Sequence, residues 1–136
     1  FEHEVGTDQV NPNGTTTAVS SFIQSFDFDL EQRQRDAQGK SSGPKVAGEV
    51  FLALRRFVPD FKVLQGNAKV TIGLKRYPQQ STTNSTYSPF TITSSTTKKD
   101  TRARGRFCSF KIENDASSES WRFGTFRVDV QADGRR

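Results

Sequence analysis

Arginines at alternate positions form the most suggestive chemical pattern in this sequence. Arg102, Arg104 and Arg106 share one parity within the segment TRARGRFCSFKIEN. If this segment is a single β-strand, the three guanidinium groups lie on one face, about 6.8 Å from each neighbour. A guanidinium can bind a carboxylate or a phosphate through two parallel hydrogen bonds. The row is therefore a candidate contact for a polyanion or for an acidic partner.

Four more arginines belong to the same candidate set, and they lie in or after the last predicted strand: Arg122, Arg127, Arg135 and Arg136. The final two could contact a partner or simply face water. We favour a reading in which the row of three pairs with Asp and Glu of neighbouring strands or subunits, because basic strand faces are more often paired or solvated. The one aromatic residue beside those arginines is Phe107, which follows Arg106 and lies on the opposite face, so the pattern lacks the stacking platform typical of single-strand nucleic-acid binding.

Residues that catalyse reactions or bind metals are scarce. His3 is the only histidine and Cys108 the only cysteine, so the pattern offers no Cys–His or Ser–His–Asp constellation and no cysteine-rich zinc site. Asp27 and Asp29 alternate with phenylalanines, which predicts solvent-facing carboxylates. Cys108 alternates with Phe110, which predicts a small buried residue. We therefore expect no enzyme, no cofactor and no metal.

Length and composition favour one small domain. The 136 residues are only 32% apolar but include twelve phenylalanines, so the core must depend on aromatic rings. Residues 1–50 carry four basic and eight acidic side chains, whereas residues 51–136 carry sixteen and seven. This asymmetry could attract neighbouring copies to each other or direct the basic part toward nucleic acid. No apolar run is long enough to cross a bilayer, so membrane insertion is not expected.

The spacing of apolar residues predicts an all-β fold: an antiparallel β-sandwich or open barrel of about six to seven strands with long polar loops. The stretches Gln32–Pro44 and PQQSTTNSTYSP are expected to be such loops. A strand around Leu52 is apolar on both faces, as expected at a sheet centre or beneath a neighbouring subunit. Two further sets of alternating residues are expected to face the core, in strands over 22–30 and 68–75: Phe22, Phe26, Phe28 and Leu30, and Ala68, Val70, Ile72 and Leu74.

The last predicted strand changes phase in its middle. Trp121 and Phe123 have one parity and Phe126 the other, which predicts a β-bulge beside Gly124 in a bent strand at a sheet rim. This strand is expected to form a hairpin with the preceding arginine-rich strand, through the turn at residues 114–119. One core is expected to bury Trp121, Phe110, Ile72 and Leu74.

Four segments combine into a longer pattern that covers about two-thirds of the chain: FLALRRFVPDFK, VTIGLKRYP, RARGRFCSFKIEN and WRFGTFRVDVQADGRR. In this order they resemble the C-terminal β domain of the tail nozzle proteins of short-tailed bacteriophages, also called tail tubular protein B or stabilisation proteins. The Arg-Gly-Arg element and the Trp-Arg-x-Gly-x-x-Arg-x-Asp-Val ending are the more specific pieces. VPDF alone is weak.

The resemblance implies a structural, non-enzymatic subunit of the phage tail in the virion. Such subunits form a homohexameric tube below the portal and adaptor rings, through which the genome leaves the head. The implied partners are copies of the chain itself, other tail proteins such as the adaptor, and DNA passing through a channel. The chain begins with Phe1, so residues 1–136 are expected to be one β domain at the C-terminal end of a longer polypeptide. Residues 1–19 fit no element of the family and form an uncertain extension.

Two functional hypotheses follow from different classes. The leading one is an assembly module, in which loops and the charge asymmetry provide subunit contacts. The alternative is a nucleic-acid-binding β-barrel module that uses the arginine row together with Arg122 and Arg127. A carbohydrate-binding sandwich is disfavoured, because Trp121 is the only tryptophan.

Overall fold

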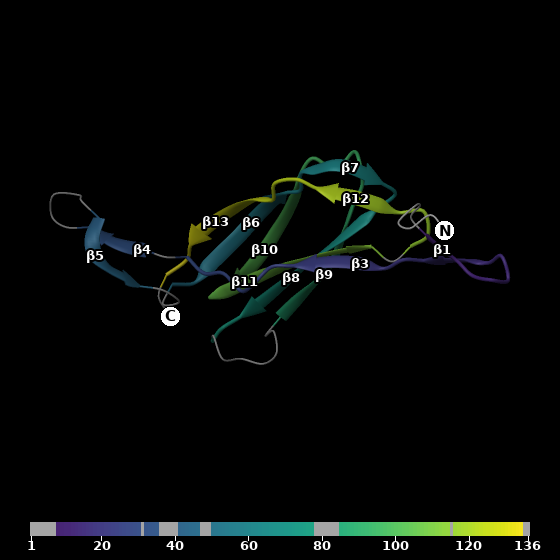
Figure 1. The fold of residues 1–136 in the computed structure, drawn as a ribbon. Coiled ribbons are helices and arrows are strands. Elements are labelled where there is room, and N and C mark those ends of the chain that lie inside the picture. Colours follow the sequence, from purple (N-terminus) through teal and green to yellow (C-terminus); the bar gives the residue numbers. More distant parts are fainter. Residues whose placement is uncertain are drawn as a thin grey trace.

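The computed structural model describes residues 8–30, 32–35, 41–46, 50–77, 85–114 and 116–134. These residues form β-strands and connections (Figure 1). The strands are β1 (Asp8–Val10), β2 (Thr16–Ala18), β3 (Ser21–Gln24), β4 (Gln32–Arg35), β5 (Ser41–Val46), β6 (Leu52–Val58), β7 (Phe61–Gln65), β8 (Ala68–Lys75), β9 (Ser85–Ile92), β10 (Lys99–Gly105), β11 (Phe107–Asn114), β12 (Ser120–Phe123) and β13 (Arg127–Ala132). Among the residues described, no helix is long and apolar enough to cross a membrane.

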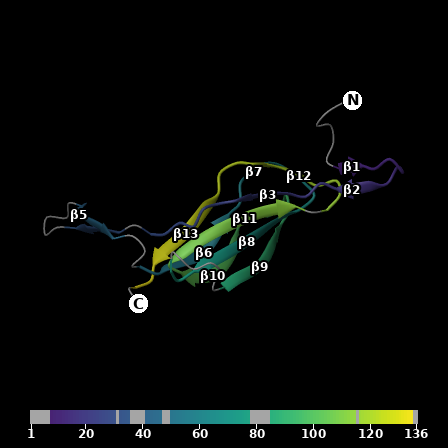
Figure 2. The same ribbon diagram turned by 60° about the horizontal axis from the view of Figure 1, so that its bottom comes forward.

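Two antiparallel sheets form a sandwich, as the sequence predicts. One sheet has the strand order β10-β6-β13 and the other β3-β11-β8-β9. The two sheets stay separate, so the fold is a sandwich and not a closed barrel. The two sheets contain seven strands, but the described residues form thirteen strands in all, which exceeds the expected six to seven. Shorter two-stranded sheets, β1-β2, β4-β5 and β7-β12, are added to this body (Figures 1 and 2).

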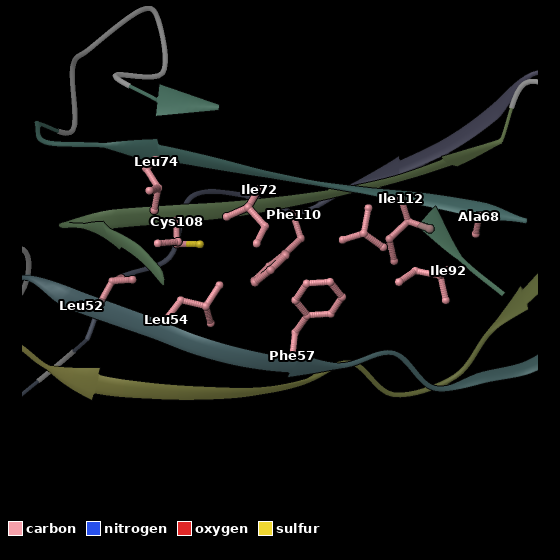
Figure 3. Packing of buried hydrophobic residues seen from close by; sticks show 12 residues of the cluster. Leu52, Leu54, Phe57, Ala68, Ile72, Leu74, Ile92, Cys108, Phe110 and Ile112 are labelled. Carbon is pink, nitrogen blue, oxygen red and sulfur yellow. The ribbon is translucent and has the colours of Figure 1, made fainter. Parts of the chain in front are cut away.

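The hydrophobic core lies between the inner faces of the two sheets (Figure 3). The predicted inner row of β8 is confirmed, since these four residues are at most 2% exposed: Ala68, Val70, Ile72 and Leu74. From the other sheet, β6 contributes Leu52, Leu54 and Phe57, all fully buried. The expected central position of this strand is also correct, because β6 pairs with β10 on one side and β13 on the other.

A β-bulge in β6 directs the largest ring into this core. Arg56 pairs with Asp129 and Leu54 with Val130, so Arg55 is an extra residue without a partner on β13. Such a bulge changes the alternation of side chains between the two faces. Phe57 therefore faces inward, although strict alternation from Leu54 would place it outside.

The C-terminal segment is two strands and not the single bulged strand that the sequence predicts. β12 pairs with β7, β13 pairs with β6, and residues 124–126 lie between them outside regular pairing. The phase change at Gly124 was located correctly, and β13 is an edge strand as expected. The phase change is caused by a close crossing of two chain segments. At this crossing, the Gly124 N–H donates to the Asp60 carbonyl oxygen at 2.7 Å.

The predicted hairpin between the last two segments is wrong. β12 follows β11 through the turn near residue 116, but it pairs with β7, and β6 lies between β10 and β13. Trp121 is also less buried than expected. It packs at the margin of the core, edge-to-face with Phe61, and its indole Nε1 donates to Oδ1 of buried Asn114 at 3.0 Å. A partner for the indole N–H explains this marginal position.

The N-terminal third also differs from expectation. Phe28 and Leu30 pack against the core, but Phe22, on the edge strand β3, and Phe26, just after it, are exposed. The stretch Gln32–Pro44, expected to be a loop, includes β4 and most of β5. Backbone pairing in a hairpin requires no apolar periodicity, and this hairpin projects away from the sandwich (Figures 1 and 2).

Candidate functional site

The predicted arginine row does not lie on one strand. β10 ends at Gly105 and β11 begins at Phe107, and the two strands belong to different sheets. Arg106 occupies the corner, and its backbone N–H donates to the Lys75 carbonyl oxygen at 3.0 Å. A Cβ on Gly105 would lie 3.1 Å from a side-chain carbon of Leu74. Position 105 at this corner therefore favours glycine. The prediction of one continuous strand face that carries all three arginines is wrong.

Arg104 spans the outer face of the three-stranded sheet. It starts on β10 and reaches Asp133 beyond the end of β13, which requires crossing β6, a separation of roughly 9.5 Å between the outer strands. Its guanidinium carbon lies 4.5 Å from the ring centroid of Phe51, which precedes β6. Nε donates to Oδ2 of Asp133, and Nη2 donates to the Asp133 carbonyl oxygen at 3.1 Å. This confirms an ion pair for one residue of the row.

The backbone fixes the partners of Arg104. The Asp133 N–H donates to the Phe51 carbonyl oxygen at 2.7 Å, and the Phe51 N–H donates to the Gly134 carbonyl oxygen at 2.9 Å. These bonds extend the pairing of β6 and β13 by one step, so the carboxylate and the ring lie side by side. Both charged side chains are half exposed, and the pair therefore orients the guanidinium more than it stabilises the fold.

Arg106 shares the same aromatic ring from the corner. Its guanidinium carbon lies 5.1 Å from the Phe51 centroid and 5.9 Å from the Tyr77 centroid. With Arg76 and Arg104, these residues line an open pocket of ≈ 510 Å³. Within the described part of the chain, Nε of Arg106 is buried and has no hydrogen-bond partner. The pocket joins cationic and aromatic groups from three separate segments of the sequence.

The remaining candidate arginines have different positions. Arg102 lines a second hollow of ≈ 490 Å³, beside Arg104 and over β6. Arg122 on β12 and Arg127 on β13 are exposed and lie outside both hollows. Arg135 and Arg136 lie outside the described residues. Arg104 thus shares the first hollow with Arg106 and the second with Arg102. The candidate arginines that the structure describes do not all lie in one site.

The described residues hold no cluster of three or more His, Cys, Asp or Glu side chains that could bind a metal ion. Asp27 pairs with Nζ of Lys75 at 2.6 Å. Cys108 is fully buried, as the sequence predicts, and burial, assisted by the charge of Asp27, raises the pKa of its thiol to about 12. A buried thiol of this kind is a packing residue and not a nucleophile.

The Cys108 thiol should resist alkylation by iodoacetamide at about pH 8 in the folded protein and react rapidly in guanidinium chloride. The reagent reacts with the thiolate, which the folded chain suppresses because the pKa is raised to about 12, whereas unfolding returns the pKa to about 8.5. Mass spectrometry of the adduct over time measures both rates. Equal rates in the two states would contradict this assignment.

Sequence reasoning missed Phe51, Arg76 and Tyr77 as site residues. Phe51 and Tyr77 were read only as parts of strands, and Arg76 was not singled out. A signal was present in the adjacent pair Arg76-Tyr77 at the end of β8, where a strand end places side chains at the rim of a sandwich. Nothing in the sequence places that rim beside Arg106.

Comparisons with known proteins leave the family open. No family model matches the sequence, and no curated protein matches it significantly. Function is therefore argued from the residues and their geometry.

Proposed function

We propose that this chain is an assembly module that binds further copies of itself, as the C-terminal β domain of a tail nozzle subunit. The observation that carries the proposal is the exposure of large apolar side chains on β3 and just after it. Phe22 is 66% exposed, Ile23 47% and Phe26 95%. Phe22 and Ile23 are consecutive residues of the strand and therefore lie on opposite faces, so a neighbouring chain paired with this edge could cover both.

The position of β3 strengthens this argument. It is the edge strand of the four-stranded sheet, so one side of its backbone has no partner strand in that sheet. Soluble proteins commonly protect such edges with charged residues or proline. The β3 sequence SFIQ contains neither. Association with a neighbouring subunit would cover both the edge and the exposed rings.

The projecting hairpins support the same function. β1-β2 and β4-β5 extend from the sandwich in opposite directions (Figures 1 and 2). Two-stranded hairpins are marginally stable alone and gain stability by packing on another surface. Val10 and Val19, on and beside the first hairpin, are 71% and 49% exposed. Arms of this kind suit contacts between neighbours in a ring.

The nozzle assignment rests on the sequence resemblance and on these surfaces together. It places the chain in the phage tail of the virion, in a ring or tube, with a homohexamer as the expected stoichiometry and the adaptor as a neighbouring protein. The genome would pass through this tube during ejection. A structural role agrees with a fold whose conspicuous surfaces are apolar and basic.

Replacing Phe22 and Phe26 together by serine should reduce self-association while the domain stays folded. Both rings are exposed, so the fold loses little packing, whereas an interface would lose two aromatic contacts. Sedimentation velocity over a range of concentrations measures the assembly, and circular dichroism measures folding. Val128→Ser, at a position 38% exposed on β13, is the matched control. A parent chain that stays monomeric, or a double variant that assembles like the parent, would refute the proposal.

A nucleic-acid-binding module is the second candidate. The convergence of Arg104 and Arg106 favours it, but these arginines line a compact pocket, whereas binding along a strand requires an extended groove with several stacking rings.

A further inference from the structure

We propose that the pocket lined by Phe51, Arg76, Tyr77, Arg104 and Arg106 binds one nucleotide, with its phosphate on the guanidinium groups and its base against the Tyr77 ring. This inference concerns a small-ligand site and does not depend on the assembly role proposed above. The pocket is lined by residues next to β6, on β10, at the corner at Arg106 and directly after β8, whereas the exposed apolar residues lie on and just after the edge strand β3.

The cationic lining of the pocket favours an anion with several acceptor oxygens. Three guanidinium groups line it, those of Arg76, Arg104 and Arg106, and Asp133 pairs with Arg104. A terminal phosphate carries a charge of about −1.5 to −2 at pH 7 and has three acceptor oxygens. A single side-chain carboxylate carries one charge and two oxygens. The phosphate therefore matches the pocket better.

The guanidinium groups are held in place before a ligand arrives. The Phe51 ring contacts Arg104 at 4.5 Å and Arg106 at 5.1 Å, and Asp133 fixes Nε and Nη2 of Arg104. Ordering long side chains normally costs binding free energy. Here the fold has already restricted both of them, which leaves their remaining N–H groups to bind oxygen atoms.

Arg106 provides the clearest sign that a polar partner is missing. Its Nε is buried and, among the described residues, has no hydrogen-bond partner. A buried donor without a partner is costly, and native structures satisfy most such groups. Because this atom is inaccessible to solvent, a shift of the Arg106 side chain would be needed to bring Nε to a phosphate oxygen in the pocket.

Tyr77 provides a surface for a base. Its side chain is 63% exposed, and its centroid lies 5.9 Å from the guanidinium carbon of Arg106. Bases stack on aromatic side chains in many proteins that bind single-stranded nucleic acid. Arg106 and Tyr77 are neighbours, so one nucleotide can contact both groups.

The size of the pocket limits the ligand. At ≈ 510 Å³ it lies within the range of small-molecule sites, about 300–1,000 Å³. This volume suits one nucleotide, either free or at the 5′ end of a strand. Binding assays with adenosine monophosphate, with a 5′-phosphorylated oligothymidylate and with its 5′-hydroxyl form distinguish these sources.

Isothermal titration of the chain should show that adenosine monophosphate binds about tenfold more tightly than inorganic phosphate and than adenosine, since each of these lacks one of the two contacts. Preference for the phosphorylated oligonucleotide over adenosine monophosphate would assign the pocket to a strand end, and the reverse preference to a free nucleotide. Absence of binding by both nucleotide probes would overturn the proposal.

Two variants locate the site. Arg106→Gln should weaken binding of adenosine monophosphate by about tenfold, as expected for a lost charged hydrogen bond. Tyr77→Leu should weaken it by a similar factor but leave binding of inorganic phosphate unchanged. Because Tyr77 is exposed, this variant tests the proposal even if Arg106→Gln fails to fold.

Arg122→Gln is the matched control, since it removes the same charge from an exposed position on β12 outside the pocket. It should change the affinity by less than about twofold, because distant surface charges are screened by salt. Equal losses in Arg122→Gln and Arg106→Gln would overturn the proposal in favour of nonspecific attraction. Tighter binding of a glutamate-rich peptide than of either nucleotide would overturn it in favour of carboxylates from a neighbouring copy.

Discussion

Replacing Phe57 with alanine should lower the free energy of unfolding by about 3–5 kcal/mol. The Phe57 side chain is fully buried and lies where the aromatic rings of both sheets meet. Its ring centroid is 5.4 Å from that of Phe90, 6.4 Å from that of Phe110 and 5.3 Å from that of Phe126. Truncation removes all three ring contacts and leaves a cavity that the surrounding strands can fill only in part.

Chemical denaturation followed by circular dichroism measures this loss. Phe26→Ala is the control, because the same substitution at a side chain that is 95% exposed should change stability by no more than about 0.5 kcal/mol. The comparison separates the effect of burial from the effect of removing an aromatic residue. Similar losses in the two variants would show that the rings of Phe57, Phe90 and Phe110 do not form the core described here.

Replacing Gly124 with valine should destabilise the domain by about 2–3 kcal/mol. A Cβ at this position would lie 2.7 Å from the carbonyl oxygen of Asp60 and 3.2 Å from its side chain. The carbonyl belongs to the backbone between β6 and β7 and accepts a hydrogen bond from the Gly124 N–H. The clash can therefore be relieved only if the segment between β6 and β7 moves away from the segment between β12 and β13.

Thr125→Val tests whether the effect is specific to the crossing. The side chain of Thr125 is exposed and directly follows the glycine, so this variant places the same valine one residue away from the contact. We expect it to stay within about 0.5 kcal/mol of the parent chain. Thermal denaturation of both variants measures the difference, and a Gly124→Val chain as stable as Thr125→Val would disprove the close crossing.

The two proposed surfaces can be tested independently because they share no residue. The exposed apolar residues lie on and just after the edge strand β3, whereas the pocket is lined by Phe51, Arg76, Tyr77, Arg104 and Arg106. The Phe22 and Phe26 double substitution should therefore leave nucleotide binding unchanged, and Arg106→Gln should leave self-association unchanged.

The sequence by itself determined the all-β class and much of the core. In β8 every second residue is apolar, and the same residues are buried, because a strand that covers a core turns alternate side chains toward it. The burial of Cys108 could also be predicted, from its alternation with Phe110. Each of these features depends on residues close together in the chain.

Strand partners and sheet membership were decided only by the tertiary structure. Parity describes the two faces of one strand and cannot show that the chain changes sheets at Arg106, nor that β12 pairs with β7. The bulge at Arg55 likewise reverses the parity of Phe57 without a mark in the sequence pattern. Phe26 lies after β3, in the segment that continues along the outer edge of β11, and no local pattern specifies this position.

The candidate pocket also depends in part on local sequence and in part on tertiary structure. The sequence singled out Arg104 and Arg106 by their spacing, but their shared contact is Phe51, more than fifty residues earlier. Tyr77 enters the pocket because the corner at Arg106 is hydrogen-bonded to Lys75 at the end of β8. Local spacing predicts the cationic groups of the pocket. The aromatic rings and the acidic partner that orient them come from distant strand ends, which only tertiary packing brings together.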